Sequence, residues 1–322
     1  MNSSSKRIVF MGTPAFAVPS LAALLDAGHT IAGVVTAPDK PAGRGMQLTL
    51  PPVKRFAEDK GLTVLQPDNL KDEDFIEDLQ ALNGDLFVVV AFRMLPEVVF
   101  SMPPMGTINL HASLLPNYRG AAPINRVLMN NEPVTGVTTF FIQKDIDTGP
   151  ILKQAPLEIT PNMLAGELHN QLMHLGANVL VQTVNDLFHG TSTSIPQQDL
   201  IKPGEILKTA PKINREDSLI NWEDAAEKIH HQVRGLSPQP GASTLFLSES
   251  GHSFGVKILE TELDKTAQWG TPGEVLLEKP NKLWIQTGSG SLRVKKLQQS
   301  GKKIMVIAEF LRGFREQIIS AG

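Results

Sequence analysis

Short apolar runs alternate with amphipathic segments over the first 110 residues of the chain. Runs typical of buried strands occupy residues 7–11, 30–35, 63–65, 86–90 and 107–110. Segments with helical spacing of apolar residues lie between them, at 16–25, 53–60 and 72–82. This alternation predicts a Rossmann-like, doubly wound α/β sheet, because parallel strands need crossover connections. The unbroken apolar run at 86–90 is typical of a central strand.

Two late strands are expected at 134–142 and 151–155, and a long helix is expected to follow them and to end near residue 188. Thr160 suits the cap of this helix, and Pro161 suits its first position, where a missing N–H costs nothing. Leucines at 164, 168, 172 and 175 recur at helical spacing. They predict the side of the helix that faces the core.

The composition changes after residue 189, where Ser, Thr, Gln, Pro and Gly become frequent. Beyond this stretch a helix is expected at 225–233, followed by five short strands at 243–247, 255–259, 273–277, 282–286 and 291–297. Strands at this spacing predict a small β-barrel with an OB-like fold. We therefore expect an α/β domain over 1–189, a linker over 190–209 and a barrel domain over 210–322.

Length and composition agree with a folded protein of about two domains. The 322 residues include no cysteine, which excludes disulfides and thiolate chemistry and fits a cytoplasmic protein. Neither a signal-peptide core nor a membrane-spanning run is expected. The net charge is −3, but residues 207–322 carry 16 Lys and Arg against 13 Asp and Glu, a balance of +3. This balance is either ordinary scatter or a sign that the barrel contacts a nucleic acid backbone.

The candidate chemistry lies in Asn109, His111 and Asp147. Asn109 and His111 are two residues apart, so they point the same way if the strand continues through them, and strand ends border the crevice of an open sheet. Asp147 precedes a Thr-Gly turn. An amide, an imidazole and a carboxylate supply oxyanion donors, a titratable ring and its partner. This set fits direct acyl transfer better than a covalent mechanism.

Other sites are less favoured by the sequence. Gly12-Thr-Pro14 lacks the spacing of a dinucleotide fingerprint, and Pro14 removes an N–H, so a nicotinamide enzyme is not expected. No spacing of the eight histidines suggests a metal site. The loop at 36–45 carries Lys40 and Arg44 among Pro and Gly, and it is either a surface loop or an arm that orders on a phosphate-rich partner.

The segment 109–124 reads Asn-x-His-x-Ser-Leu-Leu-Pro-x-x-Arg-Gly-Ala-Ala-Pro-Ile and resembles the signature of folate-dependent formyltransferases. The Asp-Thr-Gly at 147–149 lies at the distance expected in that family. The loop at 38–45, the linker and the β-rich tail narrow the resemblance to the branch that formylates methionyl-tRNA. The similarity extends from Ile8 to about Gly313. Gln143-Lys-Asp145 departs from the usual pattern and leaves the shape of the Asp147 turn open.

The resemblance implies transfer of a formyl group from 10-formyltetrahydrofolate to the methionine amine of initiator methionyl-tRNA, by a cytoplasmic enzyme that we expect to be monomeric and to need no metal. It implies catalytic roles for Asn109, His111 and Asp147. The implied folate-binding residues are Ser113, Leu114, Leu115 and Pro116, with Phe92, Arg93, Met94 and Leu95 around the pterin. Lys40 and Arg44 match the loop that meets the tRNA acceptor end.

Three alternatives stay open. A formyltransferase for a small amine, such as a glycinamide nucleotide or an amino-sugar nucleotide, would carry the same catalytic set. Residues 210–322 disfavour the single-domain purine enzyme more than the amino-sugar branch, and the loop with Lys40 and Arg44 favours tRNA. A non-enzymatic RNA-binding protein would not need Asn109, His111 and Asp147 together. A dehydrogenase would need the missing fingerprint.

Overall fold

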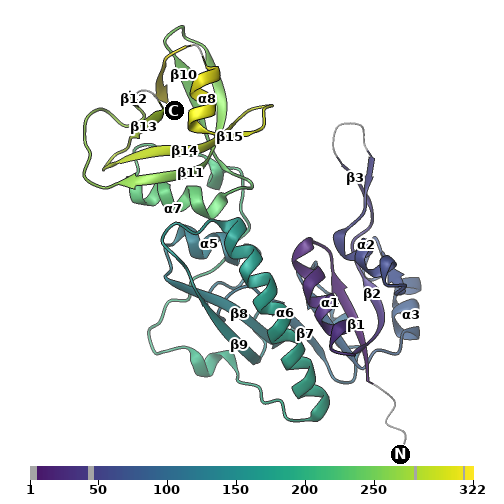
Figure 1. The fold of residues 1–322 in the computed structure, drawn as a ribbon. Coiled ribbons are helices and arrows are strands. Elements are labelled where there is room, and N and C mark those ends of the chain that lie inside the picture. The colour runs from purple at the N-terminus through teal and green to yellow at the C-terminus, as the bar shows by residue number, and fades with distance from the viewer. Residues whose placement is uncertain (1–5, 43–46, 279–280, 315) are drawn as a thin grey trace, which may run out of the picture. The chain divides into compact units, whose positions relative to one another are not determined.

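A computed structural model describes residues 6–42, 47–278, 281–314 and 316–322. Its first unit contains a mixed sheet in the strand order β5-β2-β1-β6-β7-β8-β9 (Figure 1). The strands are β1 (Arg7–Gly12), β2 (Thr30–Val35), β5 (Val64–Leu65), β6 (Leu86–Val90), β7 (Thr107–His111), β8 (Val134–Phe141) and β9 (Ile151–Glu158). Pairing is parallel from β5 to β7 and antiparallel from β7 to β9. The Rossmann-like fold predicted from the sequence is thus confirmed.

Helices cover both faces of this sheet. The helices are α1 (Val18–Asp26), α2 (Pro52–Asp59), α3 (Glu73–Ala81), α4 (Glu97–Phe100) and α6 (Ala165–His189). Phe75 and Leu79 of α3 and Val99 of α4 join Val9 and Val89 of the sheet in one buried cluster. On the other face, Gly176 of α6 lies against Leu110, and Thr183 of α6 shares a 2.8 Å hydrogen bond with Thr139.

The long helix begins later than expected. Thr160 and Pro161 lie in a turn, in which the Met163 N–H donates to the carbonyl of Thr160 at 3.0 Å, and α6 begins only at Ala165. The Glu167 carboxylate accepts a 3.0 Å hydrogen bond from the Leu164 N–H. A carboxylate that reaches back by three residues in this way caps a helix start. The prediction of a cap at Thr160 was therefore wrong.

The segment 190–209 runs along the first unit. Ile195 and Ile151 exchange backbone hydrogen bonds of 2.9 and 2.8 Å, and Gln197 of the short 3-10 helix η2 (Gln197–Leu200) is fully buried. The Tyr118 N–H donates to the carbonyl of Lys208 at 2.6 Å. Clustering of contacts places this segment, to Thr209, in the first unit. The second unit comprises 210–322 together with 121–133 and 159–168.

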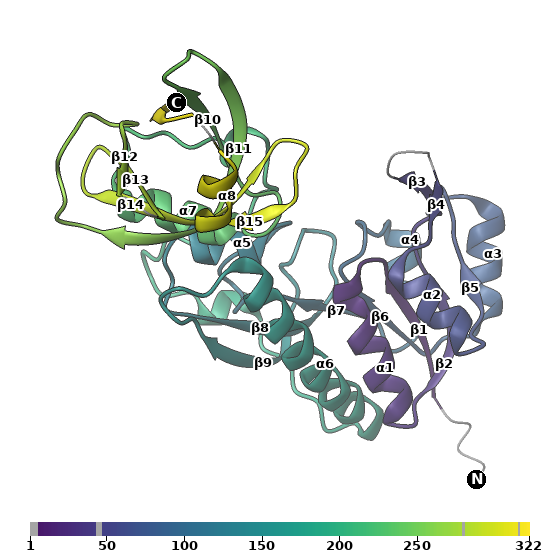
Figure 2. The same ribbon diagram turned by 45° about the horizontal axis from the view of Figure 1, so that its top comes forward.

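The second unit is an antiparallel, nearly closed barrel of the expected OB-like kind (Figure 2). Its strands are β10 (Ala242–Ser248), β11 (Ser253–Asp264), β12 (Val275–Glu278), β13 (Lys282–Gln286), β14 (Ser291–Gln299), β15 (Ile304–Val306) and β16 (Ile318–Ala321). The sheet order is β12-β13-β14-β11-β10-β16, with β15 beside β14. A 2.7 Å hydrogen bond from the Ala321 N–H to the carbonyl of Gly273 links the two ends. α5 (Pro123–Met129), α7 (Ala226–Leu236) and α8 (Ile307–Gly313) complete the unit.

A buried histidine in this unit predicts sensitivity to acid. Burial lowers the pKa of His230 from 6.5 to about 4, and the nearby His231 and Arg234 act in the same direction, while Glu227 opposes them. The unfolded chain therefore binds one more proton than the folded chain between pH 6.5 and about 4. The free energy of unfolding should fall by up to about 3 kcal/mol as the pH falls through this window.

Tryptophan fluorescence can follow this loss of stability, because all three tryptophans, Trp222, Trp269 and Trp284, lie in the second unit. Urea titrations at pH 7 and pH 4.5 should give a smaller difference for His230→Asn than for the wild type. The exposed His252 offers a matched control, since His252→Asn should keep the full difference. Equal differences for all three proteins would contradict the role of His230.

Candidate functional site

Strand β7 positions Asn109 and His111. Asn109 pairs with Val89 of β6 on one side and with Phe140 of β8 on the other, and His111 pairs with Thr138 of β8. The two side chains are two residues apart on one strand, so they share a face of the sheet. They lie at the carboxyl end of β7, on the side of the sheet where open α/β proteins bind their ligands.

The His111 ring is only 6% exposed, and each of its two nitrogens has a polar neighbour. Nε2 lies 2.8 Å from the carbonyl oxygen of Tyr118. A carbonyl only accepts, so Nε2 must carry a proton. Nδ1 faces Oδ2 of Asp147 at 3.7 Å. A proton on Nδ1 would therefore make His111 a cation beside a carboxylate, able to donate to a developing negative charge.

Asp147 is fixed in an unusual backbone conformation. Its φ angle is +55°, in the left-handed region that few non-glycine residues adopt. Oδ2 accepts a 2.9 Å hydrogen bond from the Gly120 N–H. Two residues on, a Cβ at Gly149 would lie 1.7 Å from the carbonyl oxygen of Phe141, so only glycine fits there. These contacts define the turn that the sequence left open.

The Asn109 side chain is half-buried, and no hydrogen bond ties its amide to another side chain or backbone group in the described part of the chain. An amide with unused donors, on the same face as His111, is suited to bind a substrate carbonyl oxygen. The structure thus brings His111 and Asp147 together directly. Asn109 lies on the same face of β7 as His111, two residues before it.

The segment expected to bind folate, Ser113–Pro116, lies largely inside the first unit. Ser113, Leu115 and Pro116 are buried, and Leu114 is half-buried. The Thr138 hydroxyl donates to the carbonyl of Ser113 at 2.6 Å and accepts from the Leu115 N–H at 3.1 Å. The Ser113 hydroxyl donates to the carbonyl of Asn117 at 2.8 Å, and the Leu115 side chain belongs to a buried cluster with Phe140 and Ile151. Backbone and side-chain contacts thus fix the loop after His111.

The segment after β6 offers one open side chain. Met94 is 72% exposed, whereas Leu95 is buried and Phe92 is half-buried. The Arg93 guanidinium folds back and donates to the carbonyl oxygens of Pro67 and Asp68, so it does not extend into solvent. Met94 is therefore the most open side chain of residues 92–95, and the Arg93 charge is tied to the protein.

Of the two cations in the 36–45 loop, Lys40 and Arg44, the structure describes only Lys40. Lys40 is exposed in β3 (Lys40–Ala42), which pairs antiparallel with β4 (Gln47–Thr49). Arg44 lies outside the described residues. No metal-binding group of three or more His, Asp or Glu side chains forms within the described part of the chain. Nor does any helix there have the length and apolar character needed to cross a membrane.

Two residues beside Asp147 were given no role by the sequence. The Gln197 amide donates to the carbonyl oxygens of Asp147 and Gly149 at 2.8 Å each. Arg119 donates from Nε and Nη2 to the Gln197 side-chain oxygen, at 3.0 and 2.6 Å. Arg119 belongs to the Arg-Gly-Ala-Ala-Pro part of the recognised signature, which was a usable signal. Gln197 carried none, because the polar composition around it is that of a linker.

Comparison with known proteins gives matches along nearly the whole chain. The formyl transferase family model matches residues 6–184, and the model of the formyl transferase C-terminal domain matches residues 212–315. The methionyl-tRNA formyltransferase of Bacteroides fragilis is 44% identical over 98% of this chain and 97% of its own length. That of Parabacteroides distasonis is 46% identical over 98% of each chain. This chain belongs to the methionyl-tRNA formyltransferase family. Membership confirms that it is an enzyme of the folate-dependent formyltransferase class.

Solved structures support the fold at lower identity. HypX from Aquifex aeolicus in complex with tetrahydrofolic acid superposes with a TM-score of 0.64 at 17% identity, over 96% of this chain. This chain spans about half of the HypX chain, 47%. The sugar 3N-formyl transferase WlaRD superposes with a TM-score of 0.63 at 20% identity, over 94% of this chain and all of WlaRD.

Proposed function

We propose that this chain transfers the formyl group of 10-formyltetrahydrofolate to the α-amine of methionine on initiator methionyl-tRNA. The sequence identity of 44–46% along nearly the whole chain to proteins named for this activity carries the proposal. The His111–Asp147 pair beside the open amide of Asn109 supports it chemically. We propose further that the enzyme acts in the cytoplasm, as a monomer and without a metal.

The proposed reaction is a direct displacement. The neutral amine attacks the formyl carbon, and the new C–N bond makes a tetrahedral oxyanion. Asn109 and protonated His111 donate to this oxygen. Asp147 accepts the proton of the amine, through water. The bond between the formyl carbon and folate nitrogen 10 then breaks. That nitrogen takes the electron pair together with a proton from the same network, so tetrahydrofolate and the formylated amine leave.

The acceptor decides between this function and its main alternative, an amino-sugar formyltransferase, which has the same fold in WlaRD. The test supplies 10-formyltetrahydrofolate labelled in the formyl carbon, with methionyl initiator tRNA, methionyl elongator tRNA or an amino-sugar nucleotide. We expect label on the initiator tRNA. Initiator tRNA with an N-acetylated methionine is the control, because its amine is blocked. Label on the sugar alone would contradict the proposal.

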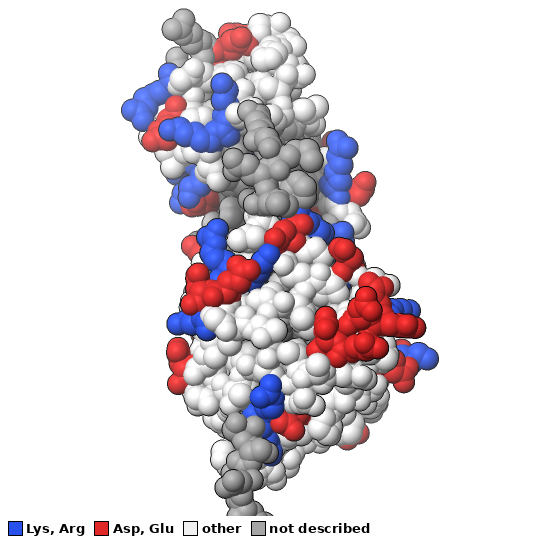
Figure 3. All heavy atoms as spheres, turned by 90° about the vertical axis from the view of Figure 1, so that its right-hand side faces the viewer, with Lys and Arg blue, Asp and Glu red and all other residues white. Residues whose placement is uncertain are grey.

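One face of the first unit is unsuited to tRNA. Exposed carboxylates gather on and just before α3, and Figure 3 views the side of the molecule on which they lie. They are Asp72, Glu73, Asp74, Glu77 and Asp78. Negative charge at this density repels a polyanion. We therefore expect tRNA to approach the first unit from elsewhere.

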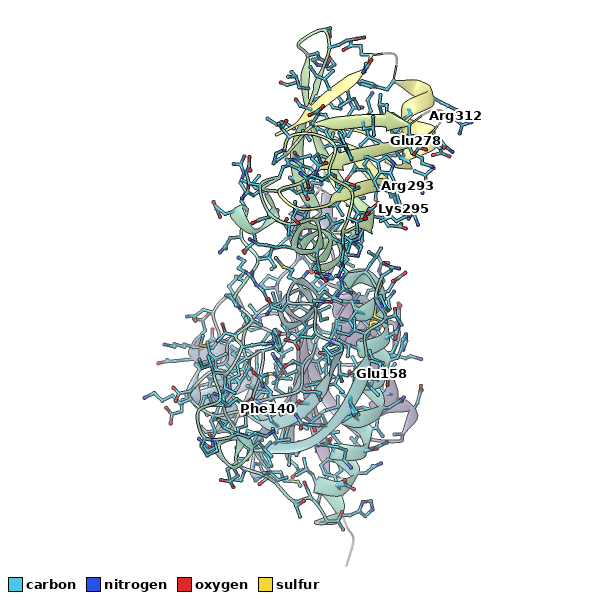
Figure 4. All side chains as sticks on the ribbon, turned by 90° about the vertical axis from the view of Figure 1, so that its left-hand side faces the viewer. Phe140, Glu158, Glu278, Arg293, Lys295 and Arg312 are labelled. Carbon is cyan, nitrogen blue, oxygen red and sulfur yellow. The ribbon has the colours of Figure 1, made fainter. Side chains whose placement is uncertain are left out.

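The barrel carries cations that are already partnered. Lys295 and Lys296 lie 3.6 and 3.1 Å from Glu260 oxygens, and Arg293 lies 3.1 Å from an oxygen of Glu262; Figure 4 labels Arg293 and Lys295 on this sheet. Such surface pairs are weak, so a phosphate can compete for the same cations. Because residues 207–322 have a balance of only +3, we expect the barrel to add modest, salt-sensitive affinity for RNA.

Arg44 should position the tRNA and take no part in the chemistry. We expect Arg44→Ala to weaken methionyl-tRNA binding and to leave folate binding unchanged, because phosphate contacts orient a nucleic acid without touching the second substrate. Separate binding titrations of the two ligands test this. Arg55→Ala, which removes an exposed cation of α2, is the matched control. Equal losses for both ligands in Arg44→Ala would contradict the assignment.

A further inference from the structure

We propose that Gln197 and Arg119 are positioning residues that hold Asp147 in its working conformation. The inference rests on the proposed function and deepens it, because it assigns a catalytic purpose to the segment between the two family-model matches. It starts from the burial of Gln197. This side chain is 0% exposed and touches no open surface, so it can affect the reaction only through its partners.

The four hydrogen bonds of the Gln197 side chain fix the orientation of its amide group. Both amide N–H groups point to carbonyl oxygens, those of Asp147 and Gly149. Its side-chain oxygen faces two N–H groups of Arg119, which only donate. If the amide were flipped, its oxygen would face the two carbonyl oxygens and its N–H groups would face the two N–H groups of Arg119, so all four hydrogen bonds would be lost. Every donor and both lone pairs are thus used, a combination that glutamate, leucine or a shorter asparagine cannot reproduce.

Arg119 closes a ring around Asp147. The next residue, Gly120, donates its backbone N–H to Oδ2 of Asp147. The Arg119 guanidinium holds the side-chain amide of Gln197, which in turn binds the backbone of Asp147. Burial lowers the pKa of Arg119, and attraction by Asp147 opposes that shift. The carboxylate and the backbone of Asp147 are therefore held from the same two-residue stretch, 119–120.

The strained backbone of Asp147 explains the need for this ring. A non-glycine residue with a φ of +55° keeps that conformation only where its surroundings fix it. If the two carbonyl contacts were lost, the turn would relax and the carboxylate would leave its place 3.7 Å from Nδ1 of His111. Misplacement of a reacting group by about 1 Å lowers turnover by about 100-fold.

The first test compares Gln197→Leu with Gln198→Leu, which changes the exposed neighbour in η2. We expect Gln197→Leu to lower kcat by about 10- to 100-fold, because a misplacement of the Asp147 carboxylate by about 1 Å costs up to about 100-fold. Folate binding and the KM for the acceptor should stay near wild-type values. Gln198→Leu should match the wild type. A kcat for Gln197→Leu within twofold of the wild type would overturn the proposal.

Arg119 supplies an independent variant if Gln197→Leu does not fold. Arg119→Met removes both donors to Gln197, whereas Arg119→Lys keeps one charged donor near the same oxygen. Arg119→Lys should therefore retain more of the wild-type kcat than Arg119→Met. Equal losses in the two variants would count against positioning through Gln197.

The decisive comparison repeats Gln197→Leu in the Asp147→Asn background. A residue that acts through Asp147 should add little further loss there, whereas a merely structural residue should cause the same fold loss in both backgrounds. Hydrogen exchange of the Gly120 amide gives a readout without turnover and should speed up in Gln197→Leu. Failure of the wild type to formylate methionyl-tRNA would refute the proposed function, and unchanged Gly120 exchange would refute this inference.

Discussion

Asp147→Asn is expected to lower the single-turnover rate of formyl transfer by at least about 100- to 1,000-fold. The asparagine oxygen can still accept from the Gly120 N–H, so the turn should persist. The negative charge facing Nδ1 of His111 would be gone, and no group would remain there to take the proton of the amine. The rate should be measured with both substrates saturating, so that it reports chemistry alone.

The exposed Asp145 provides the control for this variant, because it lies in the same turn without facing His111. Asp145→Asn should keep wild-type turnover. Circular dichroism and folate binding should be unchanged in both variants. If purified Asp147→Asn turns over at a near-normal rate, Asp147 is not a proton acceptor in this reaction.

Asn109→Ala is the second variant with a large expected effect. Loss of one oxyanion donor costs about 100- to 1,000-fold in turnover, and Asn109 is the amide donor on the face that carries His111. Its amide is not tied to another group in the described part of the chain, so stability should change little. The expected result is thus a large loss of kcat with an unchanged urea midpoint. Asn178→Ala, an exposed change on α6, serves as the control.

The result for Asn109→Ala distinguishes a catalytic role of Asn109 from a purely structural one. An asparagine at a strand end can also serve only to satisfy a turn. In that case Asn109→Ala would lower the urea midpoint and leave turnover near normal. The opposite pattern would support its role as an oxyanion donor.

The sheet and the pair on β7 could be predicted because their signals are local. Continuous apolar runs mark the parallel strands, and the spacing of Asn109 and His111 places them on one face of a strand. The match of 109–124 to a known signature then points to Asp147. These features depend on residues close together in the chain, or on a resemblance that spans it.

The remaining features depend on contacts between distant segments. Gln197 lies 50 residues after Asp147, and its burial follows from the pairing of Ile195 with Ile151. The start of α6 was misplaced because Thr160–Pro161 is a good local signal that the contact of Glu167 with Leu164 overrides. The short strands β15 and β16 pair only within the barrel, so their local sequence does not mark them.

The central claim is that Asn109, His111 and Asp147 meet around the formyl carbon as it passes to the amine. A crystal structure with an analogue of 10-formyltetrahydrofolate, in which carbon replaces nitrogen 10, tests it most directly. We predict that the formyl oxygen lies about 2.7–3.1 Å from the Asn109 amide nitrogen, with His111 and Asp147 lining the same space. A formyl group bound away from these three side chains would contradict the account.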